Sequence, residues 1–305
     1  MAHLNRRRFA IGSLAACTGV SVASGHQVFE LRGIRGTIGI HVRSPSTLTE
    51  ESPILLVIPG SGRSARSYLE PWLKTSERNS VLVASLRFSE HDYDFAAYHM
   101  GGVIKNLRLP PIRPDKRGVL TLSDEAIQFD FNPDPTRWIF ADIERVFDFL
   151  RRHFNNQRET YDVFGHSAGG QILHRMAVFG RGGRASRIVA ANSGFYTLPE
   201  LSVPLPTGLL GTGLQKDDLI RAFKTNLTVL LGEDDNGEHA GRTLLRTPAV
   251  DLQGRGRLQR GKSFLESARR VSREFGVPLH WRLKTVPNTG HNFRKMSEAA
   301  ASLLY

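Results

Sequence analysis

Apolar residues in this chain gather in short unbroken runs, and helical spacing fills the gaps between them. The runs occupy residues 53–59, 81–86, 161–164, 187–191, 227–231 and 279–286. Unbroken apolar runs of this length predict strands that are covered on both faces of a sheet.

The region before these runs has a different pattern. Residues 27–43 alternate between apolar and polar side chains, with Gly33 and Gly36 near the middle. Alternation with a central glycine-containing turn predicts two antiparallel strands joined as a hairpin.

Apolar residues recur at spacings of three and four in residues 139–154, 264–275 and 293–303. This spacing predicts helices, and Gly276 and Pro278 predict the end of the second one. Strands that alternate with helices favour parallel pairing through crossover connections. The sequence therefore predicts an α/β fold: a mostly parallel central sheet, helices on both faces and a leading antiparallel hairpin.

Two long segments interrupt the alternation. Residues 89–135 are rich in proline, and residues 197–226 are rich in leucine, glycine and proline. Long connections in a compact domain usually form lids or binding loops. We interpret both as lid-like insertions in a single domain that spans residues 26–305.

The first 25 residues have the features of an export signal. Arg6, Arg7 and Phe9 resemble a twin-arginine motif, and the apolar stretch that follows is too short to span a membrane. We therefore expect the twin-arginine export machinery as a partner and a periplasmic or extracellular location.

Two endings of this signal remain open. Leu14 to Cys17 resembles a lipobox, in which Cys17 would carry a lipid and anchor the protein to a membrane. Alternatively, the small residues from Ala23 to Gly25 form an ordinary cleavage site. Cys17 is the single cysteine, so the mature chain cannot form an internal disulfide in either case.

The composition is that of a soluble globular protein, with 40% hydrophobic and 23% charged residues. The formal net charge is +12, but the arginines are scattered, and no nucleic-acid-binding motif accompanies them. We interpret the charge as a general surface property and expect no nucleic-acid partner.

The most informative motif is Gly165-His166-Ser167-Ala168-Gly169. An apolar strand precedes it and an apolar helical segment follows it. A serine on so tight a strand-to-helix turn is lifted above the sheet, and glycines leave room for the turn. Ser167 is therefore the candidate nucleophile.

Together, the hairpin, the strand order and this motif resemble the α/β-hydrolase superfamily from about residue 28 to the C-terminus. Within it, the chain is similar to serine esterases of the poly(3-hydroxyalkanoate) depolymerase and feruloyl esterase type. The resemblance implies a base and an acid that follow the serine in the order serine, acid, histidine.

The resemblance places the acid after the strand at 227–231. The family's Gly-x-x-Asp spacing from Gly232 selects Asp235, with Asp234 as an open alternative. His291 follows the next strand in a glycine-containing turn before the final helix, where the fold places its base. The implied triad is Ser167, Asp235 and His291.

The oxyanion of such a reaction needs two donors. The resemblance assigns them to the backbone N–H groups of Ala168 and Ser61, although Pro59 stands where relatives have histidine. For nearby Arg63 and Arg87, recognition of an acidic substrate and a surface ion pair both remain open.

The implied activity is exported hydrolysis of a carboxylic ester, either small or polymeric, through an acyl-enzyme. No metal or organic cofactor is implied.

Two alternatives use the same residues differently. Residues 60–65 match G-x-G-x-x-A, a dinucleotide-binding pattern, so an NADP-dependent oxidoreductase could use Arg87 for the 2′-phosphate. A non-catalytic binding protein on a hydrolase scaffold is the other alternative. The ordered Ser167, Asp235 and His291 favour the hydrolase over both.

Overall fold

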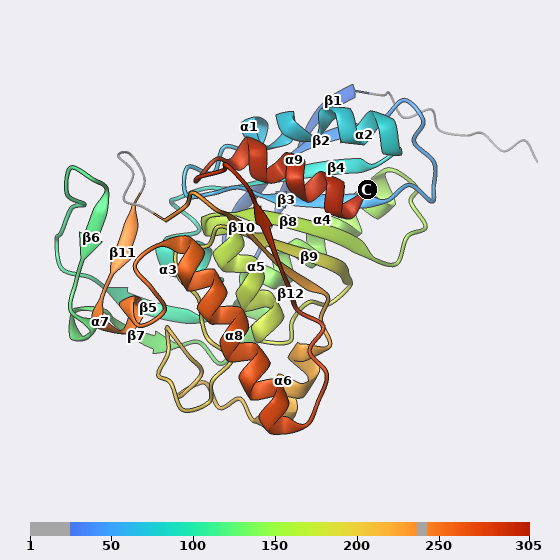
Figure 1. Ribbon diagram of the computed structural model, residues 1–305. Helices are drawn as coiled ribbons and strands as arrows, with labels where there is room; N and C mark the ends of the chain where they lie inside the picture. Colours follow the sequence, from blue (N-terminus) through green and yellow to red (C-terminus); the bar gives the residue numbers. More distant parts are fainter. Residues whose placement is uncertain (1–24, 237–242) are drawn as a thin grey trace, which may run out of the picture.

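The computed structural model describes residues 25–236 and 243–305, which build a central eight-stranded sheet flanked by helices (Figure 1). The predicted signal, including Cys17, lies outside the described residues apart from Gly25, which starts the first strand. Export and lipidation therefore stay predictions.

The sheet confirms the strands that the sequence predicts. Its strands lie in the order β1 (Gly25–Arg32), β2 (Thr37–Ser44), β4 (Leu82–Phe88), β3 (Ile54–Ile58), β8 (Tyr161–His166), β9 (Ala185–Ala191), β10 (Leu227–Gly232) and β12 (Arg282–Val286). Strand β2 is antiparallel to both of its neighbours, and the pairs from β4 to β12 are parallel. The carboxyl ends of the parallel strands therefore meet at one edge of the sheet.

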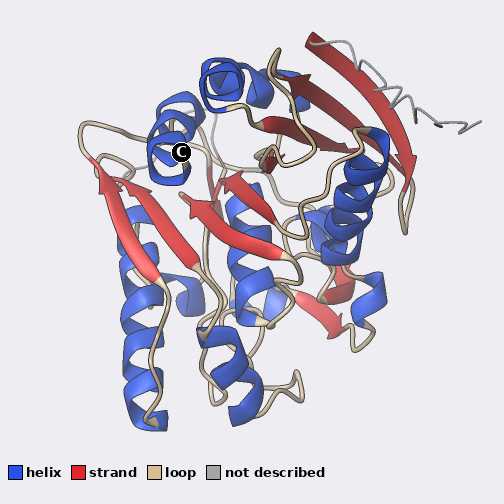
Figure 2. Ribbon diagram, turned by 90° about the vertical axis from the view of Figure 1, so that its right-hand side faces the viewer, coloured by secondary structure: helices blue, strands red, loops and turns tan. Residues whose placement is uncertain are grey.

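Helices cover both faces of the sheet (Figure 2). One face packs against α1 (Ala65–Leu69), η1 (Glu70–Trp72) and α9 (Phe293–Leu304). The other face packs against α4 (Ile139–His153), α5 (Ala168–Val178), α6 (Lys216–Phe223) and α8 (Arg257–Phe275). Helix α2 (Leu73–Asn79) follows η1.

Strand β3 shows why the central strands are apolar throughout. Leu55 and Val57 belong to the core on the α1 and α9 side, whereas Ile54, Leu56 and Ile58 belong to the core on the other side. Successive side chains of a strand point to opposite faces, so a strand between two helical layers needs apolar residues at every position.

The first insertion contains short elements that its proline-rich sequence does not predict. They are α3 (Phe95–Tyr98), β5 (Ile104–Arg108), β6 (Val119–Thr121), η2 (Asp124–Ala126), β7 (Gln128–Phe131) and η3 (Pro135–Arg137). Strand β5 pairs with β7, and β6 pairs with β11 (Leu244–Arg246), which is followed by α7 (Pro248–Asp251). These elements lie beyond the carboxyl edge of the main sheet (Figure 1).

Two predicted boundaries are wrong. Helix α8 begins at Arg257, well before residue 264. The apolar spacing does not reveal its first turns, because Arg257 and Arg260 occupy buried positions there. Strand β12 begins at Arg282 and not at residue 279, since the N–H of His280 donates to the carbonyl of Phe223 outside the sheet.

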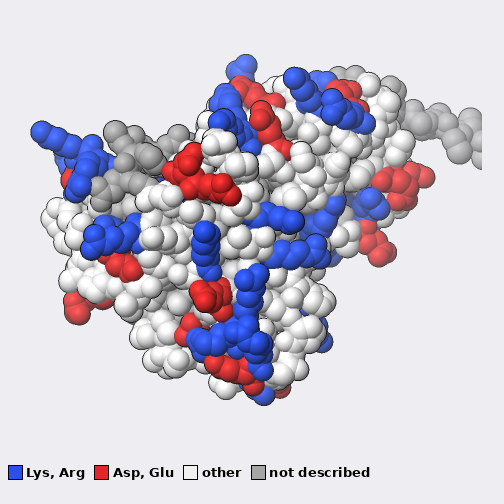
Figure 3. All heavy atoms as spheres, in the orientation of Figure 1, with Lys and Arg blue, Asp and Glu red and all other residues white. Residues whose placement is uncertain are grey.

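Lysine and arginine side chains are interspersed with acidic ones on the face that Figure 3 shows. This distribution fits the interpretation of the net charge as a general surface property. Within residues 25–236 and 243–305, every helix is too short or too polar to cross a membrane.

We predict that Gly169→Ala destabilises the fold by about 3 kcal/mol, because the added methyl would overlap main-chain atoms. A Cβ at Gly169 would lie 2.1 Å from the carbonyl oxygen of Ile58, and neither backbone can move freely. Urea unfolding followed by circular dichroism measures the loss. Gly62→Ala is the matched control, since its Cβ would meet nothing within 4 Å, and an equal loss in both variants would contradict the prediction.

Candidate active site

Ser167 lies at the turn between β8 and α5, as the sequence predicts. Its backbone has φ 58° and ψ −114°, a strained conformation for a residue with a side chain. The N–H of Ser167 donates to the carbonyl of Ala191 over 2.9 Å, which ties the turn to the end of β9. The half-buried Ser167 lines a cavity at the carboxyl edge of the sheet.

The structure brings the other two predicted residues to the same edge. The Nδ1 of His291 lies 2.6 Å from Oδ2 of Asp235, and both side chains are buried. The ring of His291 also packs 4.5 Å, centroid to centroid, from that of His166, the residue before Ser167.

Asp235, and not Asp234, is the acid that contacts the histidine. Asp234 is exposed, and its backbone N–H donates to the carbonyl of Thr289 over 3.0 Å. Of the two candidate carboxylates, Asp235 is the one that has a hydrogen bond to His291.

Asp235 is fully buried, yet it stays ionised. Burial alone would raise the pKa of this carboxyl, but the hydrogen bond and charge of His291, together with the nearby Arg257, hold the pKa below its ordinary value. The carboxylate can therefore fix the tautomer of His291 by accepting its Nδ1 proton.

The loop after β3 lies directly against the serine. Ser61 lines the same cavity as Ser167, and Ala168 is the first residue of α5. A Cβ at Gly60 would lie 2.8 Å from the Tyr68 hydroxyl and 3.4 Å from Cβ of Ser167, so only glycine fits there without a shift.

Tyr98 and Arg63 hold this loop in place, which the sequence does not predict. The Tyr98 hydroxyl donates to the carbonyl of Pro59 over 2.8 Å. Arg63 is buried, lies 4.2 Å from the centre of the Tyr98 ring and donates to the carbonyl of Ser89 over 2.9 Å. Neither open interpretation of Arg63, a substrate contact or a surface ion pair, describes these contacts.

The cavity has a volume of about 330 Å³ and is mainly apolar. Most of its wall comes from the first insertion, and Gly194 and Phe195 contribute from the segment after β9. The lining residues from the first insertion are Phe95, His99, Met100, Ile104, Leu107, Leu109, Leu120, Leu122 and Ile127.

His99 and Gln171 are polar groups in this wall. Burial lowers the pKa of His99 to about 3, and the charges of Arg63 and Arg175 add to the effect, so the imidazole is neutral at physiological pH. Gln171 lies one turn along α5 from Ser167, and its Nε2 is buried without a hydrogen-bond partner in the described structure.

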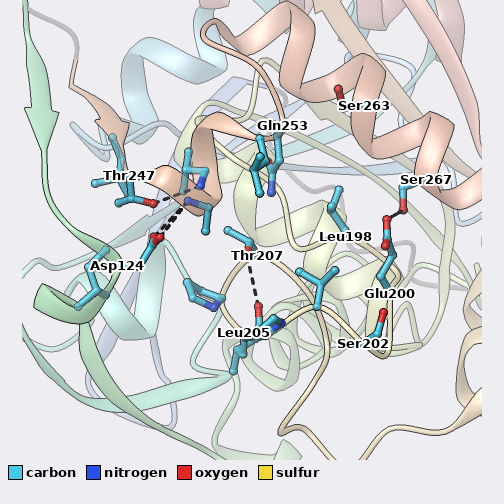
Figure 4. A pocket seen from close by; sticks show the side chains of 18 of the residues that line it. Asp124, Leu198, Glu200, Ser202, Leu205, Thr207, Thr247, Gln253, Ser263 and Ser267 are labelled. Carbon is cyan, nitrogen blue, oxygen red and sulfur yellow. Dashed lines mark hydrogen bonds between the residues drawn. The ribbon is translucent and has the colours of Figure 1, made fainter.

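A second cavity of about 1150 Å³ shares part of its wall with the first. Figure 4 shows side chains that line this larger cavity. Ile127, Pro206 and Leu245 line both cavities. The wall of the larger cavity also includes Glu200 and Ser267, whose side chains form a hydrogen bond of 2.6 Å.

Asn192 is a site residue that the sequence analysis misses. Its side-chain oxygen accepts from the N–H of Gly232 over 2.8 Å, and its Nδ2 donates to the carbonyl of Gly290 over 3.3 Å. Asn192 has φ 46°, a conformation that asparagine tolerates better than most residues. It therefore joins the acid turn to the histidine turn. Its position directly after a buried strand is the one signal that points to it.

Within residues 25–236 and 243–305, no group of three or more histidine, cysteine or acidic side chains could hold a metal ion.

Comparison with solved structures identifies the family. The poly(aspartic acid) hydrolase-1 of Sphingomonas sp. KT-1 is 32% identical, over 92% of this chain and 99% of its own, with a TM-score of 0.79. The chain belongs to the α/β-hydrolase superfamily. The poly(3-hydroxybutyrate) depolymerase LpqC of Bordetella parapertussis is 26% identical, over 93% of this chain and 90% of its own, with a TM-score of 0.78.

More distant α/β-hydrolases share the fold. The siderophore hydrolase EstA of Aspergillus nidulans is 12% identical, over 97% of this chain and 98% of its own, with a TM-score of 0.54. A scan against protein-family models found no match. A search of proteins with curated functions also found none.

These relatives support a hydrolase, and the geometry of residues 60–65 agrees with them. In this α/β-hydrolase the glycine loop packs against Ser167, and the helix that follows it, α1, has five residues. Arg87 is exposed. The dinucleotide-binding alternative is therefore not favoured.

We predict that Asn192→Ala lowers the free energy of unfolding by about 2–3 kcal/mol, since it removes two hydrogen bonds and leaves a buried N–H unpaired. Thermal and urea unfolding measure the change. Asn155→Ala is the control, because Asn155 has a similar φ of 48° but is exposed. Equal losses in the two variants would mean that backbone conformation, and not the side-chain bridge, accounts for the effect.

Proposed function

We propose that this α/β-hydrolase is a serine hydrolase of carboxylic esters that acts through Ser167, His291 and Asp235. The buried hydrogen bond between His291 and Asp235, beside the strained Ser167, carries the proposal. A serine hydroxyl is a weak nucleophile and needs such an oriented base.

In the proposed reaction, His291 takes the hydroxyl proton as the Ser167 oxygen attacks the ester carbonyl. The backbone N–H groups of Ser61 and Ala168 hold the negative oxygen of the tetrahedral intermediate. His291 then gives its proton to the leaving alcohol, and water hydrolyses the acyl-enzyme by the same steps. No metal or cofactor takes part in this scheme.

The wall of the smaller cavity indicates the kind of substrate. Its apolar side chains favour an ester with a hydrocarbon portion near the scissile bond, since burial of each CH₂ contributes about 0.8 kcal/mol.

We predict that Ser167→Ala lowers kcat/KM for a short p-nitrophenyl ester by roughly 10⁴-fold or more, because it removes the nucleophile. Asp235→Asn should lower it by about 10³–10⁴-fold, because His291 would lose its orientation. Asp234→Asn is the matched control and should change it by less than about threefold. Full activity in Ser167→Ala, or equal losses in the two aspartate variants, would refute the proposed roles.

The larger cavity favours an extended substrate that reaches past Pro206. By name, the two solved relatives above act on polymers, a poly(aspartic acid) and a poly(3-hydroxybutyrate). We propose that a further part of an oligomeric chain lies in this cavity, with the polyester as the first candidate and the poly(aspartic acid) as the second.

We predict that kcat/KM rises with the number of units in an oligoester series, because each added unit buries more surface in the larger cavity. Ser202→Trp, at an exposed position in its wall, should reduce this rise and leave hydrolysis of a p-nitrophenyl monomer unchanged. Chromatography of the products from polyester and from poly(aspartic acid) separates the two candidates. A rate that is independent of chain length in both series would contradict the extended site.

A further inference from the structure

Arg257 forms a buried ion pair with the proposed catalytic acid. Its Nη1 lies 3.3 Å from Oδ1 of Asp235, while Oδ2 of the same carboxylate contacts His291. The side chain of Arg257 is only 2% exposed, and its Nη2 donates to the carbonyl of Thr243 over 3.0 Å. Each carboxylate oxygen of Asp235 therefore has its own partner.

The local sequence holds this arginine in place. Arg257 is the first residue of α8, and the N–H of Leu258 donates to the backbone carbonyl of Asp235 over 3.2 Å. A Cβ at the preceding Gly256 would lie 2.4 Å from the carbonyl oxygen of Asn236, so the helix start lies directly against the acid turn. The acid turn and the start of α8 are thus one packed unit.

The ion pair between Asp235 and Arg257 affects how easily His291 is protonated. With neutral His291, Asp235 and Arg257 cancel each other. Once His291 is protonated, the buried group carries a net charge of about +1, and charges are poorly screened in the interior. In a triad without the arginine, the same protonation would instead produce a neutral pair.

Among the described residues, two other polar side chains near the proposed acid and base are those of His166 and Tyr196. The His166 ring lies beside His291, and its Nδ1 is 3.1 Å from the Tyr68 hydroxyl. Tyr196 is buried, and burial raises its pKa, with a smaller contribution from Asp235, so it stays neutral.

The next arginine of α8 has a different partner. Arg260, one turn further along the helix, pairs with Asp251 over 3.1 Å. Arg257 is therefore the arginine of this helix that acts on Asp235.

We propose that Arg257 is a positioning residue that sets the acidic limit of catalysis: it opposes protonation of His291, so hydrolysis persists at a lower pH than the same triad would allow without it. The inference rests on the proposed roles of Ser167, Asp235 and His291. The direction of the expected pH shift follows from the positive charge of Arg257. Removal of a nearby positive charge makes the imidazolium easier to form, so the acidic limb of the activity profile moves to higher pH.

The test is the pH dependence of two reactions of the full chain. One is the rate of fluorophosphonate labelling of Ser167, followed by intact mass, and the other is kcat/KM for p-nitrophenyl acetate. In Arg257→Gln we expect the acidic limb to move up by about one pH unit or more. Arg257→Lys keeps the charge and should stay close to the wild type.

Arg269→Gln is the matched control, because it removes the same charge from an exposed position of the same helix. Its limb should coincide with that of the wild type. If Arg257→Gln lowers the plateau but leaves the limb in place, the arginine has only a structural role and the proposal is wrong. An equal shift in Arg257→Lys and Arg257→Gln would also overturn it.

The wild type provides a measurement that does not depend on a variant that folds. A wild-type profile with no acidic limb over the pH range in which the protein stays folded would overturn the proposal, because Arg257 would then have no protonation of the base to oppose. Labelling that persists in Ser167→Ala would instead refute the proposed function itself. The two failures are therefore distinguishable.

Discussion

The approach of the Gly169 backbone to the carbonyl of Ile58 is the contact on which the geometry of the site depends. It brings the start of α5 against the end of β3, so the turn that carries Ser167 and the loop that carries Ser61 lie side by side. A side chain at this point would separate them, and the proposed nucleophile would no longer share an edge with both proposed oxyanion donors. The strained backbone of Ser167 is tolerated because the strands and the helix on either side of the turn are fully packed.

The second requirement is that three loops meet at this edge in one conformation. Ordering a loop opposes folding by about 1–2 kcal/mol per residue, and a single hydrogen bond contributes only about 1 kcal/mol. The structure meets this requirement with shared side chains. Asn192 bonds to the acid turn and the histidine turn, and Asp235 bonds to His291 and Arg257. Each of these side chains fixes two loops, so the geometry of the proposed triad is a property of the whole edge.

The sequence predicts the parts of this arrangement that follow a period or a motif. The six apolar runs and the alternating segment before them predict the eight strands of the main sheet. The G-x-S-x-G turn together with chain order indicates Ser167 and His291. Single polar residues that act by contact carry no such pattern. Asn192, Tyr98 and Arg257 are ordinary in sequence, and their roles emerge only when distant segments are packed together. The short strands β5, β6 and β7 escape prediction for a related reason, since they pair with each other or with β11 and not with the main sheet.

Positive charge inside the protein links the electrostatics of the base to that of the oxyanion. Arg63 and Arg175 are buried near the cavity, and their hydrogen bonds go to neutral acceptors, including the carbonyls of Ser89 and His99. The field of a buried positive charge opposes formation of an imidazolium nearby, as proposed for Arg257. In the proposed mechanism, however, the same field favours the negative oxygen that forms at the same moment on the substrate. Positive charge in the interior would therefore make the proposed base weaker and the stabilisation of the proposed oxyanion stronger at the same time.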